Sequence, residues 1–121
     1  MAVPRRVALK RPEEFQRCYK QGTVWKNRYA VVHVYDRRDE EGPRFGVAVS
    51  RRIGNAVVRN RLKRWLREAL RPLIRDVSPG VDVVVSARSG ALDAGFWRLK
   101  GAVHDLMRKS GVYHERNEGE P

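Results

Sequence analysis

A strand, a turn and a helix follow one another between residues 44 and 71, and the helix has two chemically opposite faces. The strand is RFGVAVS (44–50), and Gly54 permits a tight turn before helical spacing begins at residue 55. One side of the helix is apolar and contains Val58, Leu62, Trp65, Leu66 and Ala69. The opposite side is polar and cationic and contains Asn60, Lys63, Arg64, Arg67 and Arg71. Such a helix packs its apolar side on the protein and leaves the cationic side to solvent or a partner.

The positive charge of the chain is concentrated in this segment. The 121 residues carry 26 Lys+Arg against 14 Asp+Glu, a formal charge of +12. Residues 51–71 hold eight of the cations and one acid, Glu68, whereas the other 100 residues hold 18 cations and 13 acids. A basic surface that only keeps the protein soluble does not explain this clustering, which predicts a polyanionic partner. Twenty of the 26 cations are arginines, which contact phosphate bidentately and stack on bases, so nucleic acid fits better than a membrane.

The remaining elements follow from hydrophobic spacing. We predict helices over 12–21 and 91–109, and strands over 28–35, 44–50 and 81–87, with a short strand at Thr23–Lys26. The strands 28–35 and 44–50 are expected to form an antiparallel hairpin. VDVVVSA (81–87) is almost continuously apolar and is expected in the middle of the sheet.

The predicted order is α-β-β-β-α-β-α, an α+β sandwich with one sheet and helices packed on it. The length suits a single domain, 1–121. Residues 1–11 are predicted to be a flexible basic arm and residues 112–121 a frayed tail.

No group of residues has the spacing of a catalytic or metal site, and we expect no catalytic side chain. His33, His104 and His114 form neither HxH nor HExxH, and Cys18 has no recognisable base partner. The single cysteine excludes an intramolecular disulfide and fits a reducing compartment. The apolar runs are too short to span a bilayer and the N-terminus lacks a signal-peptide core, so we expect a cytoplasmic protein without a membrane partner.

Four stretches resemble the protein subunit of bacterial ribonuclease P. The most specific is SRRIGNAVVRNRLKRWLRE (50–68), which contains the RNR motif at residues 59–61. The others are LKRPEEFQRCYKQG (9–22), NRYAVV (27–32) and VDVVVSAR (81–88). The resemblance implies a ribosomal-protein-S5-domain-2-like fold with a left-handed βαβ crossover around the RNR helix. General folding rules alone favour a right-handed crossover.

In that family the RNA subunit removes the 5′ leader of precursor tRNA with RNA-bound Mg²⁺, and the protein binds that RNA and the leader. The resemblance therefore implies these two partners, no cofactor bound by the protein alone, and a bacterial cytoplasmic location. The positions implied to contact the RNA subunit are Arg59, Asn60, Arg61, Lys63, Arg64, Arg67 and Arg71.

The residues implied to contact the leader are Phe15, Tyr19, Val31 and His33, in a cleft between the first helix and the sheet, with Arg51 and Arg52 at its edge. Arginine stands at 51 and 52 where many members have lysine, Tyr19 replaces a common Phe, and His33 replaces a common Tyr. Charge and stacking survive these changes, but the leader contacts differ in detail.

Two other functions compete with this one. A ribosomal-type structural RNA-binding protein would explain the charge, size and fold but not the whole 50–68 segment. A DNA-binding regulator would place the helix 55–71 in a major groove, but a strand precedes that helix where a helix-turn-helix needs a short helix, so we expect no DNA partner.

Overall fold

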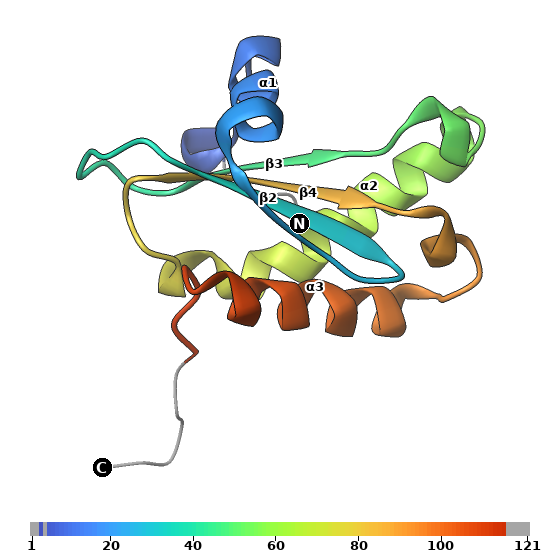
Figure 1. Cartoon of the computed structure of the whole chain (residues 1–121). Helices are drawn as coiled ribbons and strands as arrows, with labels where there is room; N and C mark the ends of the chain where they lie inside the picture. The colour runs from blue at the N-terminus through green and yellow to red at the C-terminus, as the bar shows by residue number, and fades with distance from the viewer. Residues whose placement is uncertain (1–2, 4, 116–121) are drawn as a thin grey trace.

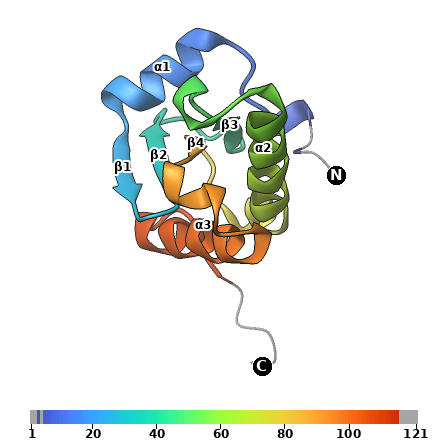
Figure 2. The ribbon, with the colours of Figure 1, turned by 90° about the vertical axis from the view of Figure 1, so that its right-hand side faces the viewer.

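The computed structural model describes residues 3 and 5–115 and shows one mixed sheet between helices. The strands are β1 (Thr23–Lys26), β2 (Ala30–Asp36), β3 (Arg44–Ala48) and β4 (Val81–Ala87), in the spatial order β1-β2-β4-β3. The helices α2 (Ala56–Leu70) and α3 (Phe96–Ser110) cover one face, and α1 (Pro12–Gln21) stands on the other (Figures 1 and 2). The predicted α+β sandwich is therefore confirmed.

The sheet pairing corrects one prediction. Strands β2 and β3 do not form a hairpin, because β4 lies between them, antiparallel to β2 and parallel to β3. Alternating apolar residues specify which face of a strand is buried, but not its neighbour. The predicted central place of β4 is correct, and the short strand at Thr23–Lys26 is confirmed as the other edge.

The connection from β3 through α2 to β4 has the rarer hand. With the helix toward the viewer and both strands pointing up, β4 lies to the left of β3 (Figures 1 and 2). This left-handed crossover agrees with the family resemblance and differs from the general rule. It places the amino end of α2 beside the carboxyl ends of β3 and β4.

Local signals explain where the first two helices begin. Helix α1 starts at Pro12, and the Glu14 carboxylate accepts hydrogen bonds from the backbone amides of Lys10 and Arg11 at 3.1 and 2.9 Å. Helix α2 is capped by Asn55, whose side chain accepts a hydrogen bond from the Val58 amide at 3.0 Å. Both predicted helices, 12–21 and 55–71, thus match the structure within one residue.

The core lies between the sheet and helices α2 and α3. It includes Leu62 and Leu66 from α2 and Leu99 and Leu106 from α3, and the alternating residues of β2 and β4 face them. On β2 these are Ala30, Val32 and Val34. The opposite, outer face of the sheet is only partly covered by α1 (Figure 1).

One predicted boundary needs correction. Helix α3 begins at Phe96 rather than at residue 91, because residues 89–92 form a 3₁₀ helix and Gly95 has a φ of 79°. Within the predicted arm 1–11, the Leu9 amide donates to the Phe45 carbonyl at 2.8 Å. Within the predicted tail 112–121, the Val112 carbonyl accepts from the Ser78 amide at 2.8 Å and the His114 amide donates to the Asp76 carbonyl at 2.9 Å. Residues 116–121 lie outside the described part.

Candidate nucleic-acid interface

The exposed side of α2 carries cations with few partners. We call Arg59, Asn60, Arg61, Lys63, Arg64, Arg67 and Arg71 the α2 cationic face. The one acid in the helix, Glu68, contacts Arg71 at 3.5 Å. Within residues 3 and 5–115, none of the other cations on this face forms an ion pair. The helix therefore presents a largely uncompensated positive charge to solvent.

The α2 cationic face spreads over two flanks of the helix rather than forming one ridge. Arg61 lies over the Trp65 ring, 5.4 Å from its centroid, on the side toward α3. Arg67 points the other way and lines a pocket of about 180 Å³ together with Phe15 and Gly46, at the β3 edge of the sheet. An RNA bound along α2 could therefore contact both flanks.

The outer face of the sheet has a covered end and an open end. At the covered end the Phe15 ring rests on Gly46, where a Cβ would come within 2.5 Å of the ring. Phe15 also packs against the buried Leu9, Cys18 and Val84. The structure thus makes Phe15 largely a packing residue at the root of α1, rather than an open wall of a cleft.

Tyr19 and His33 are brought together where the covered end gives way to the open end. Their ring centroids are 5.0 Å apart, edge to face, and the Tyr19 hydroxyl is hydrogen-bonded to Ser86. Burial raises the pKa of Tyr19 and lowers the pKa of His33, so both rings are neutral at pH 7. Tyr19 is 37% exposed, which leaves part of its ring free for contact.

The open end is made of small or short side chains in neighbouring strands. Val31 of β2 pairs with Ser86 of β4, and Ser86 pairs with Ala48 of β3. All three side chains are half-buried, and no element covers them as α1 covers Gly46. We call Tyr19, Val31, His33, Ala48 and Ser86 the outer sheet face. Gly46 and Ala48 both belong to β3, whereas Ser50 lies after the strand and caps the next turn.

Cations border the outer sheet face at the end of the sheet where β3 and β4 terminate. Arg51 and Arg52 form an exposed 3₁₀ turn directly after β3. Lys26, Arg28 and Arg88 are exposed at the same end of the sheet, near the end of β1 and the end of β4. They share this end because β4 ends where the antiparallel β2 begins, with Ala87 opposite Ala30. Sequence reasoning missed this second group, which appears only once the strand order is known.

A second arginine cluster surrounds a buried acid at the other end of the sheet. The Asp82 carboxylate is fully buried and accepts from Arg37 at 2.6 Å and from Arg44 and Arg17 at 3.0 Å each. We call these four residues the Asp82 cluster. The signal that could have found it is the acid inside the apolar run VDVVVSA, because a buried carboxylate needs charged partners.

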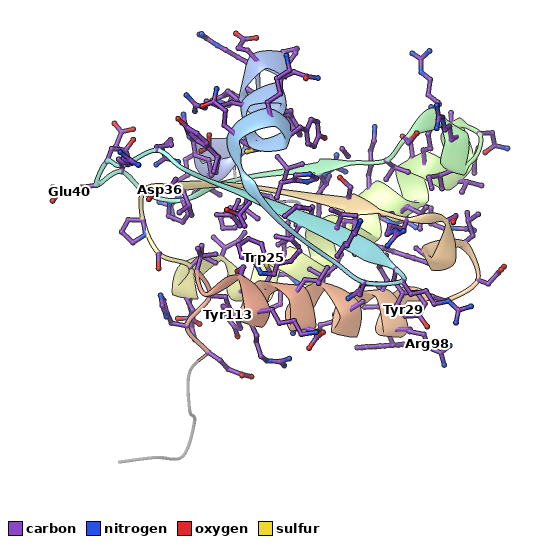
Figure 3. All side chains as sticks on the ribbon, in the orientation of Figure 1. Trp25, Tyr29, Asp36, Glu40, Arg98 and Tyr113 are labelled. Carbon is purple, nitrogen blue, oxygen red and sulfur yellow. The ribbon has the colours of Figure 1, made fainter. Side chains whose placement is uncertain are left out.

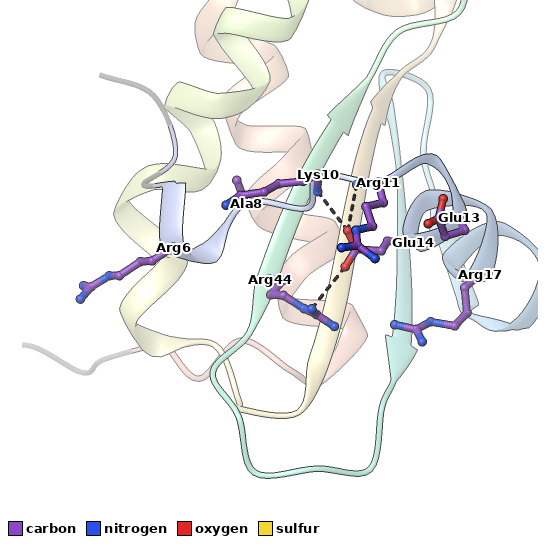
Figure 4. Close-up of a pocket in the computed structure, with 8 residues that line it drawn as sticks. All are labelled: Arg6, Ala8, Lys10, Arg11, Glu13, Glu14, Arg17 and Arg44. Carbon is purple, nitrogen blue, oxygen red and sulfur yellow. Dashed lines mark hydrogen bonds and ion pairs between the residues drawn. The ribbon is translucent and has the colours of Figure 1, made fainter.

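The Asp82 cluster borders a pocket between α1 and β3, which Figure 4 draws with its eight lining residues. Glu14 is central there, since it accepts the Lys10 and Arg11 amides and pairs with Arg44 at 3.2 Å. The cations of this pocket are thus partly neutralised by the protein itself, unlike those on α2.

The candidate catalytic groups remain apart. His104 contacts the Ala69 carbonyl at 3.2 Å, and His114 contacts the Ser78 hydroxyl at 2.7 Å, on different elements from His33. Burial raises the pKa of the Cys18 thiol to about 11, so it is protonated at pH 7. The part of the chain that the structure describes contains no group of three potential metal ligands and no helix long and apolar enough to cross a membrane.

The comparisons with known proteins converge on one family. The model of the ribonuclease P family matches residues 3–111. The ribonuclease P protein component of Symbiobacterium thermophilum is 45% identical over 104 residues, covering 86% of this chain and 90% of the relative. The chain belongs to the ribonuclease P protein family. This places it in a ribonucleoprotein of tRNA processing.

Solved structures of the ribonuclease P protein have the same fold. The Staphylococcus aureus protein superimposes with a TM-score of 0.81 at 30% identity, over 89% of this chain and 98% of that one. The Thermotoga maritima protein gives 0.73 at 29% identity, over 84% and 96%. The agreement extends to the mixed sheet and its helices, so the elements that carry the α2 cationic face are those of the ribonuclease P protein fold.

Proposed function

We propose that this ribonuclease P protein binds the RNA subunit of the enzyme through the α2 cationic face. The observation that carries the proposal is the set of cations on a capped helix of which, within residues 3 and 5–115, only Arg71 forms an ion pair. Arginine and lysine side chains so placed neutralise phosphates of structured RNA, and each neutralised phosphate releases counterions. The Asn60 amide adds a neutral hydrogen-bonding group among them.

The 5′ leader of precursor tRNA is proposed to lie across the outer sheet face. Tyr19 and His33 offer ring surfaces, and Val31, Ala48 and Ser86 form a floor low enough for an extended strand. Arg51 and Arg52, together with Lys26, Arg28 and Arg88 at the same end of the sheet, can neutralise its phosphates. Stacking on rings is tolerant of sequence, so the leader is read mainly as an unpaired strand. Phe15 helps to position this surface, because its ring packs on Gly46 and fixes α1 on the sheet.

Hydrolysis of the leader is assigned to the RNA subunit and its Mg²⁺ ions. The protein's part is to bind, to orient the leader and to screen phosphate charge close to the RNA. The separated histidines and the protonated Cys18 thiol are consistent with this division of labour. We propose no cofactor held by the protein alone.

Single-turnover cleavage tests the proposal. Precursor tRNA and a bacterial ribonuclease P RNA are mixed at a Mg²⁺ concentration too low for the RNA alone, with and without this protein. Addition of the protein should restore leader removal. A purely structural RNA-binding protein, the second candidate, would bind the RNA without restoring cleavage.

The leader site is tested separately with Tyr19, because Phe15 is tied to folding. Tyr19→Ala should weaken binding of precursor tRNA to the reconstituted enzyme by about 1–3 kcal/mol for one lost base stack. Tyr19→Phe, which keeps the ring and loses only the hydroxyl contact to Ser86, is the matched control and should bind nearly normally. Mature tRNA has no leader, so Tyr19→Ala should leave its affinity unchanged. Equal losses for both tRNAs would contradict the leader assignment.

A further inference from the structure

The amino end of α3 carries an aromatic patch that packing does not explain. Trp97 is 77% exposed, although it lies in a well-formed helix beside the core residue Leu99. Its ring meets Phe96 edge to face, with centroids 5.1 Å apart, and Phe96 meets Trp65 of α2 at 6.2 Å. We call Trp65, Phe96 and Trp97 the aromatic patch. It bridges α2 and α3 on the side of the molecule away from the outer sheet face.

Cations accompany this patch at both ends. Lys100 lies over Trp97, with its Nζ 5.3 Å from the ring centroid, and Arg61 of the α2 cationic face lies over Trp65 at 5.4 Å. Arg98 projects from the same first turn of α3, away from the sheet (Figure 3). Asp93 is the one acid in the segment from Ser89 to Lys100. The charge around the rings is therefore predominantly positive and continues that of α2.

Trp97 stands out among the exposed apolar residues. Five large apolar side chains are exposed in the described part of the chain, and Trp97 is the most exposed of them. Tyr19 and Val24 belong to the outer side of the sheet, which the proposed leader site uses. The other two are Val57 in the first turn of α2 and Leu92 just before α3. A largely exposed aromatic side chain that lies beside cations indicates a contact surface.

Gly101 adds a second observation on the same helix face. It lies one turn after Trp97, is exposed, and a Cβ built there would meet no atom within 4 Å. Glycine inside a helix costs about 1 kcal/mol relative to alanine, and no packing constraint here requires it. Its effect is to leave a flat strip beside the indole, because positions i and i+4 share a face.

We propose that the aromatic patch holds an unpaired base of the ribonuclease P RNA, stacked on Trp97, with Lys100, Arg98 and Arg61 contacting the adjoining phosphates. Rings interleaved with cations are the chemistry that binds unpaired nucleotides, since every base has a π face. The inference rests on the proposed function and extends the RNA-binding surface from α2 onto α3. A second protein molecule would also cover apolar surface, but the positive charge favours RNA.

The test is a salt-dependent titration of the ribonuclease P RNA with the full-length protein and five variants. Trp97→Ala should weaken RNA binding by about 5- to 150-fold, the range expected for one lost base stack. Its slope of log K against log salt should stay unchanged, because stacking releases no counterion. Trp97→Phe, which keeps a ring, should recover most of the affinity.

The other three variants separate this inference from the proposed function. Gly101→Ala should not weaken RNA binding beyond twofold, whereas Gly101→Gln, which obstructs the flat strip, should weaken it as Trp97→Ala does. Arg64→Ala in the same titration tests the α2 cationic face. Should Arg64→Ala weaken binding while Trp97→Ala does not, the aromatic patch is excluded and the proposed function stands. Should neither weaken binding, both proposals are overturned.

Two further outcomes would overturn the inference. One is a Trp97→Phe variant that loses as much affinity as Trp97→Ala while its circular dichroism stays native, because a ring would then be insufficient. The other is self-association of the free protein in sedimentation that Trp97→Ala abolishes without any change in RNA affinity. That result would assign the aromatic patch to a second copy of the chain.

Discussion

The two groups of arginines in this protein differ in what neutralises them. In the Asp82 cluster three guanidinium groups converge on one fully buried carboxylate, and Arg37 adds hydrogen bonds to the Glu41 and Gly42 carbonyls. On the α2 cationic face, Arg71 alone forms an ion pair with an acid of the described chain. The first group joins α1, the β2–β3 connection and β3 to the centre of the sheet, whereas the second leaves its charge available.

This difference shows why counting cations is a poor guide to a binding site. Arg17, Arg37 and Arg44 contribute as much formal charge as any three arginines on α2, yet their side chains are engaged within the fold. A buried carboxylate without partners would be costly, so these arginines are needed to keep Asp82 in place. The α2 arginines other than Arg71 neutralise no acid among the described residues, so their charge is available to a partner.

The largest expected effect comes from removing the charge at the centre of the Asp82 cluster. Asp82→Asn keeps the size of the side chain but removes the buried carboxylate that Arg17, Arg37 and Arg44 share. The nearly buried Arg37 then keeps only its ion pair with the more exposed Asp39 among the described residues. Breaking a buried pair in this way costs about 3–5 kcal/mol. Urea unfolding monitored by circular dichroism measures the loss. A variant as stable as the parent would show that Asp82 does not organise the cluster.

A smaller loss is expected from one arm of the same cluster. Arg44→Ala removes contacts to both Asp82 and Glu14. Hydrogen bonds to charged groups contribute about 1.5–3 kcal/mol, so the free energy of unfolding should decrease by an amount within or below that range. The salt slope of RNA binding should stay that of the parent, since Arg44 is neutralised inside the protein. A lower slope would place Arg44 among the RNA contacts and remove the distinction between the two groups.

The sequence predicted one arginine group and missed the other for a physical reason. Helical spacing is local, so the apolar and cationic sides of α2 could be read from residues 55–71 alone, and the apolar run of β4 indicated a central strand. The Asp82 cluster depends on contacts between positions 17, 37, 44 and 82, which only the strand order brings together. The wrong β2–β3 hairpin had the same origin, because nothing local in either strand indicates that β4 inserts between them.

The candidate site shows the same limit. Tyr19 and His33 were expected to share a surface, and their 5.0 Å ring contact confirms that they do. The spacing of Phe15 could not distinguish an open ring from a packed one, and the structure places it on Gly46. Trp97 carried no signal, because a single tryptophan next to a core position of a helix is unremarkable until its exposure is known.

The α2 cationic face should respond in the opposite way to the Asp82 cluster. Arg64 is exposed and has no ion-pair partner in the described chain, so Arg64→Ala should change the unfolding free energy by no more than about 0.5 kcal/mol. The slope of log K against log salt for RNA binding should fall by about 1, the loss of one phosphate contact. Filter binding at several salt concentrations measures it. Arg64→Lys keeps the charge and should keep the slope.

The smallest effect concerns acid, and it again separates the two groups. Burial by itself raises the pKa of Glu14, but the amides of Arg11 and Lys10 and the charge of Arg44 outweigh it and lower the pKa below the usual 4.5. The unfolded chain therefore binds a proton at Glu14 more readily than the folded chain does. The stability that Glu14 contributes is complete well above pH 4.5 and is lost as the pH falls through the folded pKa.

Glu14→Gln should accordingly be less stable than the parent at pH 7, and the difference should shrink as the pH falls below 4.5. Glu13→Gln is the matched control, because Glu13 lies in the same helical turn, is exposed and makes no ion pair among the described residues. Urea unfolding of the three proteins between pH 7 and pH 3.5 measures the differences. If Glu13→Gln and Glu14→Gln lose the same stability at pH 7, the loss comes from the favourable interaction between the helix dipole and any acid in the first turn. If only Glu14→Gln loses it, the contacts to Lys10, Arg11 and Arg44 anchor α1, and so hold Tyr19 over the sheet.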